Sequence, residues 1–254
     1  MARVDGGGVS ADFTDLAIAA AAAFAASVLG GVAGYGVGMV IPIFLAPIVG
    51  IAGVVPATTV ATLFTGFGRL WAFRRSLSWP EIRRMSALGL PMSFAGAWIL
   101  TVLEPRQLAL FLGLFLIASV PVRRLLERRS LSLGPKGTVA AGAAFGLLSG
   151  ATPGTNFLVS AILMATGLKG AALIGSIAAV GLSTHFPKIA TFAATGLLDM
   201  RLLTVGVIVG IATLPGGYVA KWLVDRLPMR IHTGIMDVLV IAGGANFLWT
   251  ALRG

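Results

Sequence analysis

The sequence predicts an all-α polytopic membrane protein with an internal duplication, in which each of two repeats has four hydrophobic segments. The 254 residues are 57% hydrophobic and only 11% charged, whereas soluble proteins are about 25% charged. We count eight apolar runs of about 20 residues, the length that crosses a bilayer, with no soluble domain between them. Gly30 and Gly34 recur 116 residues later as Gly146 and Gly150, which indicates the duplication.

The first segment of the first repeat is predicted to be broken. Residues 16–47 would form a straight helix of roughly 48 Å at 1.5 Å per residue, which exceeds a bilayer core of about 30 Å. Glycines at Gly34, Gly36 and Gly38 mark the break, and the second piece runs over Met39–Pro47. Non-helical backbone survives at this depth only where protein or a watery cavity covers it. We therefore expect a re-entrant or discontinuous helix that lines a cavity.

Three further segments complete the first repeat, residues 1–122. Four arginines follow the segment Ala57–Phe73 within eleven residues, which places that loop in the cytoplasm. Residues 123–137 carry five more basic residues and are predicted to be a cytoplasmic linker. The other two segments of this repeat are Met85–Leu103 and Gln107–Val122.

The second repeat, residues 138–254, follows the same order. Its first segment, Thr138–Gly167, is predicted to be broken at residues 152–156, with Thr152 as the N-cap and Pro153 as the first helical residue. Its second segment, Gly170–Leu198, is predicted to be interrupted at residues 185–188, because a proline within a helix removes a hydrogen bond. The last two segments are Arg201–Val224 and Ile231–Trp249.

The sequence leaves the relative orientation of the repeats open. If each broken segment crosses the membrane once, the repeats are parallel. If each is a re-entrant hairpin, the repeats are inverted. The inverted form places the acidic N-terminus outside and Lys221, Arg226 and Arg230 inside, and we favour it on that ground.

The net charge of +10 lies in short loops between apolar runs, so the positive-inside rule explains it without nucleic acid as a partner. Cysteine is absent, which removes disulfides and thiolate metal sites. We identify no cofactor and no metal motif. The expected partners are the lipid bilayer, a small anionic substrate, coupled protons and a second copy of the chain in a homodimer.

Three basic residues lie within apolar segments, where a charge costs at least about 2.5 kcal/mol. The 116-residue offset places Arg69 opposite His185, and Lys188 lies eighteen residues into its segment. We predict that all three contact an anion. The alternatives are that Arg69 extends toward the inner membrane surface, that His185 is a packed core residue, and that Lys188 forms a structural ion pair.

The predicted helix breaks supply a second way to hold an anion, because helix N-termini present unpaired N–H groups and a partial positive charge. The pieces that begin near Gly38 and Pro153 would face a shared cavity at the membrane midplane. The alternative is that these small residues serve only close helix packing. The candidate substrate contacts are Gly36, Gly38, Thr152, Thr155 and Asn156, with hydroxyls of Thr59 and Ser176 from matching positions of the next segments.

Two further residues have predicted chemistry. Asp237 is the only carboxylate well inside an apolar run, and it is a candidate for proton coupling or for an ion pair with Lys188 or Arg69. Ser149 lies beside the second break, and a Ser149–His185 pair would suggest an intramembrane serine hydrolase. This enzyme is the remote alternative, and we expect no enzymatic activity.

The order of motifs resembles the TauE/SafE family of sulfite and organosulfonate exporters, which includes relatives of toluene sulfonate uptake permeases. The resemblance covers nearly the whole chain. It rests on the glycine cluster before Pro42, residues 56–59 (PATT), the basic turn from Arg74 to Trp79, and the repetition of this order after residue 138. It implies transport of small sulfur-containing anions across the bacterial inner membrane.

The sequence therefore predicts a secondary transporter, and the resemblance indicates an exporter of sulfite or organosulfonates. A passive anion channel and a carrier for another small oxyanion or a carboxylate remain as alternatives.

Overall fold

The computed structural model describes residues 13–33, 37–128, 132–224 and 229–253. Within these ranges every regular element is a helix, which confirms the all-α class. In chain order the elements are α1 (Phe13–Ala33), α2 (Val37–Phe73), the 3₁₀ helix η1 (Arg74–Ser76), α3 (Trp79–Val102), α4 (Pro105–Arg128), α5 (Pro135–Ala151), α6 (Asn156–Ala165), α7 (Gly170–Ala194), α8 (Met200–Val224) and α9 (Met229–Arg253).

Four of the described helices, α2, α3, α4 and α7, are long and apolar enough to cross a membrane. Helix α6 and the Met200–Gly216 part of α8 are apolar but shorter. Several spans of this length in one chain are typical of a multi-pass membrane protein.

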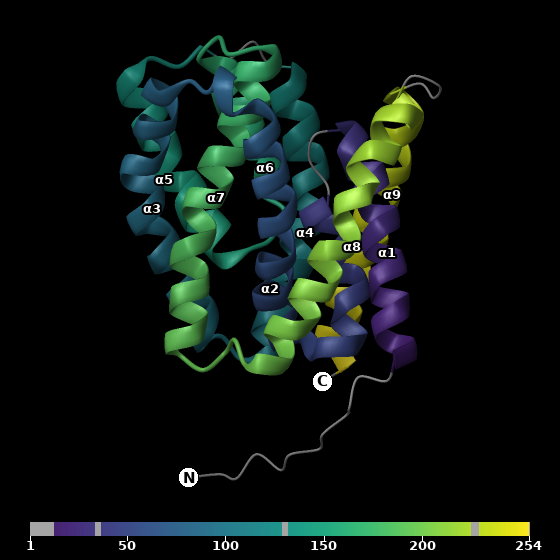
Figure 1. The fold of residues 1–254 in the computed structure, drawn as a ribbon. Coiled ribbons are helices and arrows are strands. Elements are labelled where there is room, and N and C mark those ends of the chain that lie inside the picture. The colour runs from purple at the N-terminus through teal and green to yellow at the C-terminus, as the bar shows by residue number, and fades with distance from the viewer. Residues whose placement is uncertain (1–12, 34–36, 129–131, 225–228, 254) are drawn as a thin grey trace.

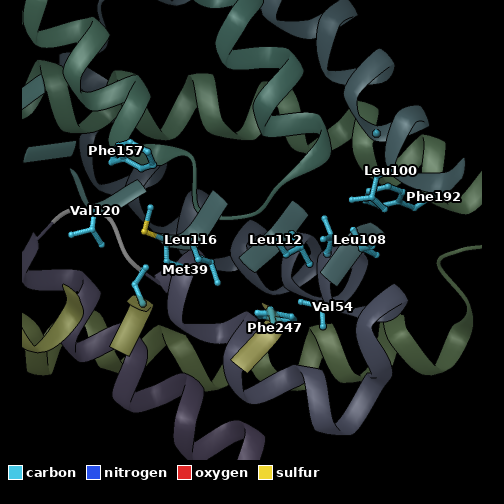
Figure 2. Packing of buried hydrophobic residues seen from close by; sticks show 13 residues of the cluster. Met39, Val54, Leu100, Leu108, Leu112, Leu116, Val120, Phe157, Phe192 and Phe247 are labelled. Carbon is cyan, nitrogen blue, oxygen red and sulfur yellow. The ribbon is translucent and has the colours of Figure 1, made fainter. Parts of the chain in front are cut away.

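The helices form two groups that meet at α2 (Figure 1). Helices α3, α5 and α7 lie on one side of α2, and α1, α8 and α9 lie on the other. A buried apolar cluster joins the two groups (Figure 2). It includes Met39 of α2, Leu112 of α4, Phe157 of α6 and Phe247 of α9. The cluster contains side chains from six helices, and Met39 and Phe157 pack into it close to the starts of α2 and α6.

Helix α2 consists of two pieces joined at Gly50, where φ is 71° and ψ is 165°. Only glycine adopts this conformation readily, so one residue supplies the kink. The sequence prediction ended one segment at Pro47 and began the next at Ala57. That boundary was wrong, because the residues between them are helical on both sides of Gly50.

Helices α5 and α6 form a hairpin. The backbone N–H of Leu133, just before α5, donates to the carbonyl of Ala165 at the end of α6, at 2.9 Å. The entry to α5 and the exit from α6 therefore lie on the same side of the protein. The re-entrant alternative for this segment stays a prediction, and this hairpin is compatible with it.

The turn of this hairpin differs from the prediction in detail. Thr152 caps the end of α5, since its N–H and hydroxyl both donate to the carbonyl of Leu148, at 2.8 and 2.7 Å. Gly154 then adopts a φ of 77°, which is left-handed and favours glycine. Helix α6 begins only at Asn156, with Thr155 as its N-cap residue. The predicted start at Pro153 was therefore wrong.

Helix α7 is continuous from Gly170 to Ala194, so the predicted interruption at residues 185–188 was also wrong. Pro187 lies inside the helix. Proline is tolerated in membrane helices where hydroxyl side chains and neighbouring helices satisfy freed backbone groups. Here the residues on both sides of Pro187 stay helical, so this proline does not end α7.

Candidate functional site

Lys188 of α7 is almost completely buried, with 2% of its surface exposed. Its ammonium donates to the backbone carbonyl of Thr152, at 3.2 Å. No carboxylate lies within 4 Å of it among the described residues, so the structural ion pair considered above is not found in this part of the chain. A buried cation is costly without a negative partner, which makes this position a natural place for an anion.

His185 lies one turn before Lys188 on the same helix, within electrostatic reach of it. Its Nδ1 lies 2.6 Å from the carbonyl of Gly181. Its Nε2 lies 2.8 Å from the hydroxyl of Thr62 on α2. The ring is therefore held at both nitrogens, and it bridges α7 and α2.

A polar cavity lies beside the side chain of Lys188. Its volume is about 20 Å³, which holds roughly one water. The turn between α5 and α6, the start of α2 and the middle of α7 all contribute to its wall. The lining residues are Gly38, Thr59, Thr62, Ser149, Thr152, Pro153, Gly154, Thr155, Asn156, His185 and Lys188.

A second cavity of about 20 Å³ adjoins the first. The two share Thr62, Asn156 and His185 as lining residues. Arg69 of α2 lines the second cavity, one turn beyond Thr65, which also lines it. Polar side chains thus continue from Lys188 through His185 to Arg69.

The start of α2 and the turn after α5 are in direct contact. A Cβ atom built on Gly38 would lie 2.9 Å from both the Cα and the N of Gly154, so only two glycines allow this approach. Val37 begins α2 and Asn156 begins α6. The positive ends of both helices therefore lie beside the cavity that contains Lys188.

The family described as sulfite exporter TauE/SafE matches residues 19–247 of the chain. The chain belongs to the TauE/SafE family. It is accordingly a membrane transport protein. No curated protein and no solved structure matches it.

Eight of the ten predicted substrate contacts in this TauE/SafE protein line the two cavities. Gly36 lies outside the described residues. Ser176 is buried elsewhere, where its hydroxyl accepts from the N–H of Ser78 at the start of α3, at 3.1 Å. The eight that are brought together are Arg69, Lys188, His185, Gly38, Thr59, Thr152, Thr155 and Asn156.

Asp237 of α9 lines neither cavity, and its ion pairs are with other residues. It pairs with Arg123, and its Oδ2 lies 2.6 Å from Nη2 of Arg124. The expected pairing with Lys188 or Arg69 was wrong. Both arginines had been assigned to the linker, but α4 continues through them to Arg128, which brings them against α9.

Ser149 is not paired with His185. Its hydroxyl lies 3.1 Å from that of Thr184, while both ring nitrogens of His185 contact other groups. The described residues thus lack the serine–histidine contact that the hydrolase alternative requires.

Sequence reasoning missed Thr62, Thr65 and Gly154. A signal for the threonines was present, because positions 62, 65 and 69 share one helix face by their three- and four-residue spacing. Positions 181, 185 and 188 share a face of α7 in the same way. Matching these two faces would have placed Thr62 beside His185.

Proposed function

We propose that this protein is a secondary transporter that exports small sulfur-containing anions, such as sulfite or organosulfonates, across the bacterial inner membrane. The observation that carries the proposal is the buried ammonium of Lys188 with one carbonyl partner, Thr152, and no carboxylate partner in the described part of the chain. An oxyanion there would neutralise the charge and accept its remaining hydrogen bonds.

The surroundings of Lys188 fit an oxyanion with several acceptor atoms. Hydroxyls of Thr59 and Thr62 and the amide of Asn156 line the same cavity. The N-terminal ends of α2 and α6 add backbone N–H groups and partial positive charge. Oxygen atoms of sulfite or a sulfonate could accept from all of these donors.

The cavity has room for roughly one water, whereas sulfite has a sulfur and three oxygens. Binding therefore requires the walls to separate, and Gly38 and Gly154 are two wall residues in close contact. A carrier changes shape in each cycle, so a contracted cavity is compatible with one. This favours a carrier over a permanently open channel.

The packing of the helices supports a duplicated architecture. Helix α5 packs on α3, and α1 packs on α8. Under the proposed duplication α1 corresponds to α5 and α3 to α8, so each repeat packs its first helix on the other repeat. Helix α4 packs on α9 and α2 on α7, which are corresponding pairs. Interlocked repeats with a site between them are common in secondary transporters.

The test is a flux panel in proteoliposomes with sulfite, sulfate, thiosulfate, methanesulfonate and a simple carboxylate. We expect saturable flux of the sulfur-containing anions that an imposed ion gradient can drive uphill. Preference for carboxylates would favour the alternative substrate class. Flux that never proceeds against the anion's electrochemical gradient would identify a passive channel.

The matched variants are Lys188→Gln and Lys169→Gln. Lys169 is an exposed lysine immediately before α7. Losing a charged hydrogen bond to the anion, worth about 1.5–3 kcal/mol, predicts at least a 10-fold weaker affinity for Lys188→Gln. The Lys169 variant should transport like the wild type. Equal transport by both variants would remove Lys188 from the site.

A further inference from the structure

His185 has a fixed proton on one ring nitrogen. A backbone carbonyl can only accept a hydrogen bond. Because Nδ1 lies 2.6 Å from the carbonyl of Gly181, Nδ1 carries a hydrogen in either charge state of the ring. The variable proton of His185 is therefore the one on Nε2, which faces Thr62.

The hydroxyl of Thr62 has one hydrogen and can donate it either to a backbone carbonyl or to His185. Its oxygen lies 2.8 Å from the carbonyl of Thr58, 3.1 Å from that of Thr59 and 2.8 Å from Nε2 of His185. When the ring is neutral, Nε2 is an acceptor and the hydroxyl must donate to it. When the ring is protonated, Nε2–H donates to the hydroxyl, which then donates to Thr58. Both states are satisfied without moving a heavy atom.

In the part of the chain that the structure describes, the charged side chains that line the cavities beside His185 are positive. Lys188 of α7 and Arg69 of α2 are the charged side chains in the walls of its two cavities. The portions of α5 and α6 that the structure describes contribute Ser149 and Asn156 there but no ionisable group, and α3 contributes no lining residue. A protonated His185 would add a further positive charge. An anion in the cavity reverses this balance, because its attraction offsets that repulsion.

We propose that His185 binds the coupled proton of this transporter, taking it up on Nε2 as the anion binds beside Lys188. This inference rests on the proposed function. It assigns proton coupling to His185 instead of Asp237. The carboxylate of Asp237 on α9 forms ion pairs with Arg123 and Arg124 of α4. His185 also forms part of the wall shared by both cavities, where it contacts an anion that moves between them.

The proposal fixes how anion affinity changes with pH. The anion complex binds one more proton than the unliganded protein, so anion affinity rises as the pH falls. Reciprocity of the two binding free energies requires it. A single linked proton gives a change of at most 10-fold in affinity per pH unit, in the range where the unliganded ring is neutral and the complex is protonated.

The experiment measures protons taken up per anion bound by the purified full-length protein. Methanesulfonate is the probe because it stays ionised, so any proton uptake belongs to the protein. A pH indicator in weakly buffered detergent solution reports the protons, and calorimetry reports binding, between about pH 5 and 8. We expect up to one proton per methanesulfonate for the wild type and none for His185→Gln, which retains the cationic Lys188.

Three further variants make the result decisive. Thr62→Val removes the partner of Nε2 and should reduce the uptake. Thr213→Val is its matched control. Thr213 is buried, its hydroxyl donates to a carbonyl of its own helix at 2.6 Å, and it lines neither cavity. That variant and Asp237→Asn should keep the wild-type uptake.

Opposite results overturn the inference. Binding by the wild type without proton uptake at any pH, or unchanged uptake in either His185→Gln or Thr62→Val, would show that His185 is not the proton site. Loss of uptake in Asp237→Asn alone would assign the proton to that carboxylate. Failure of the wild type to bind methanesulfonate, sulfite or thiosulfate would instead refute the proposed function.

Discussion

At the scale of single residues, the buried charges of Asp237 and Lys188 differ in whether an opposite charge lies beside them. Asp237 and Arg123 are each 5% exposed and contact one another. Lys188 is equally buried, and its hydrogen-bond partner among the described residues is a backbone carbonyl. Removing one member of the first arrangement would leave a buried charge unpaired, whereas the charge of Lys188 already costs stability and suits a ligand.

Asp237→Asn should therefore lower the thermal stability of the detergent-solubilised protein. Breaking a buried ion pair costs about 3–5 kcal/mol, and we expect less here because Arg124 is largely exposed. Arg124→Ala should change the melting temperature little, because exposed pairs contribute about 0–1 kcal/mol. An Asp237→Asn protein as stable as the wild type would contradict this role of the ion pair.

Lys188→Gln should show the reverse behaviour. Glutamine can keep a hydrogen bond to the carbonyl of Thr152 while removing a charge that has no negative partner in the described chain. Its melting temperature should equal or exceed that of the wild type, although its affinity for the anion is at least 10-fold weaker. A marked fall in melting temperature would mean that Lys188 has a structural role.

At the scale of elements, the approach of α2 to the α5–α6 turn depends on glycine. Gly38→Ala would place a methyl group 2.9 Å from two backbone atoms of Gly154. Overpacking of this kind costs about 1–3 kcal/mol, and it separates the walls of the proposed site. We expect reduced stability and at least a 10-fold loss of methanesulfonate affinity, measured by calorimetry.

Gly68→Ala is the control in the same helix. A Cβ at Gly68 has no neighbour within 4 Å, and alanine is favoured over glycine in a helix by about 0.5–1 kcal/mol. Stability should stay the same or rise. If Gly38→Ala behaved like Gly68→Ala, the contact between the two elements would not matter for the site.

Periodicity and composition predicted the helical class and most of the candidate site residues. Apolar runs with glycine or proline between them carry that information directly. The errors arose where one residue decides the local geometry. Pro187 predicted a break, but α7 continues through it from Gly170 to Ala194. Gly50 was not predicted to have a special role, yet its backbone conformation, with φ of 71°, produces the kink of α2.

Pairings between distant segments could not be predicted from local pattern. Asp237 and Arg124 are 113 residues apart, and Thr62 and His185 are 123 apart. Each pairing depends on which helix faces pack together. Arg123 was also assigned to a loop because it follows an apolar run, although the helix simply continues. Helix ends set by capping and charge are less certain than helix interiors.

At the scale of the whole molecule, the α5–α6 hairpin determines the topology. Because the backbone bond from Leu133 to Ala165 closes it, the exposed residues Lys136 and Lys169 flank its two ends. Helix α7 then runs from Gly170, directly after Lys169, to Ala194 (Figure 1), and the exposed Asp199 follows that end of the helix. The hairpin model places the first two residues on one side of the membrane and the third on the other.

Single cysteines test this arrangement, and the natural chain contains no cysteine to interfere. Lys136→Cys and Lys169→Cys should react with a membrane-impermeant maleimide from the same side, which the positive-inside rule identifies as the cytoplasm. Asp199→Cys should react only from the opposite side. Had α5 and α6 crossed as one broken helix, the two lysine positions would react from opposite sides. That result would reject the re-entrant hairpin and the inverted repeat, and with them the meeting of two helix N-termini beside Lys188.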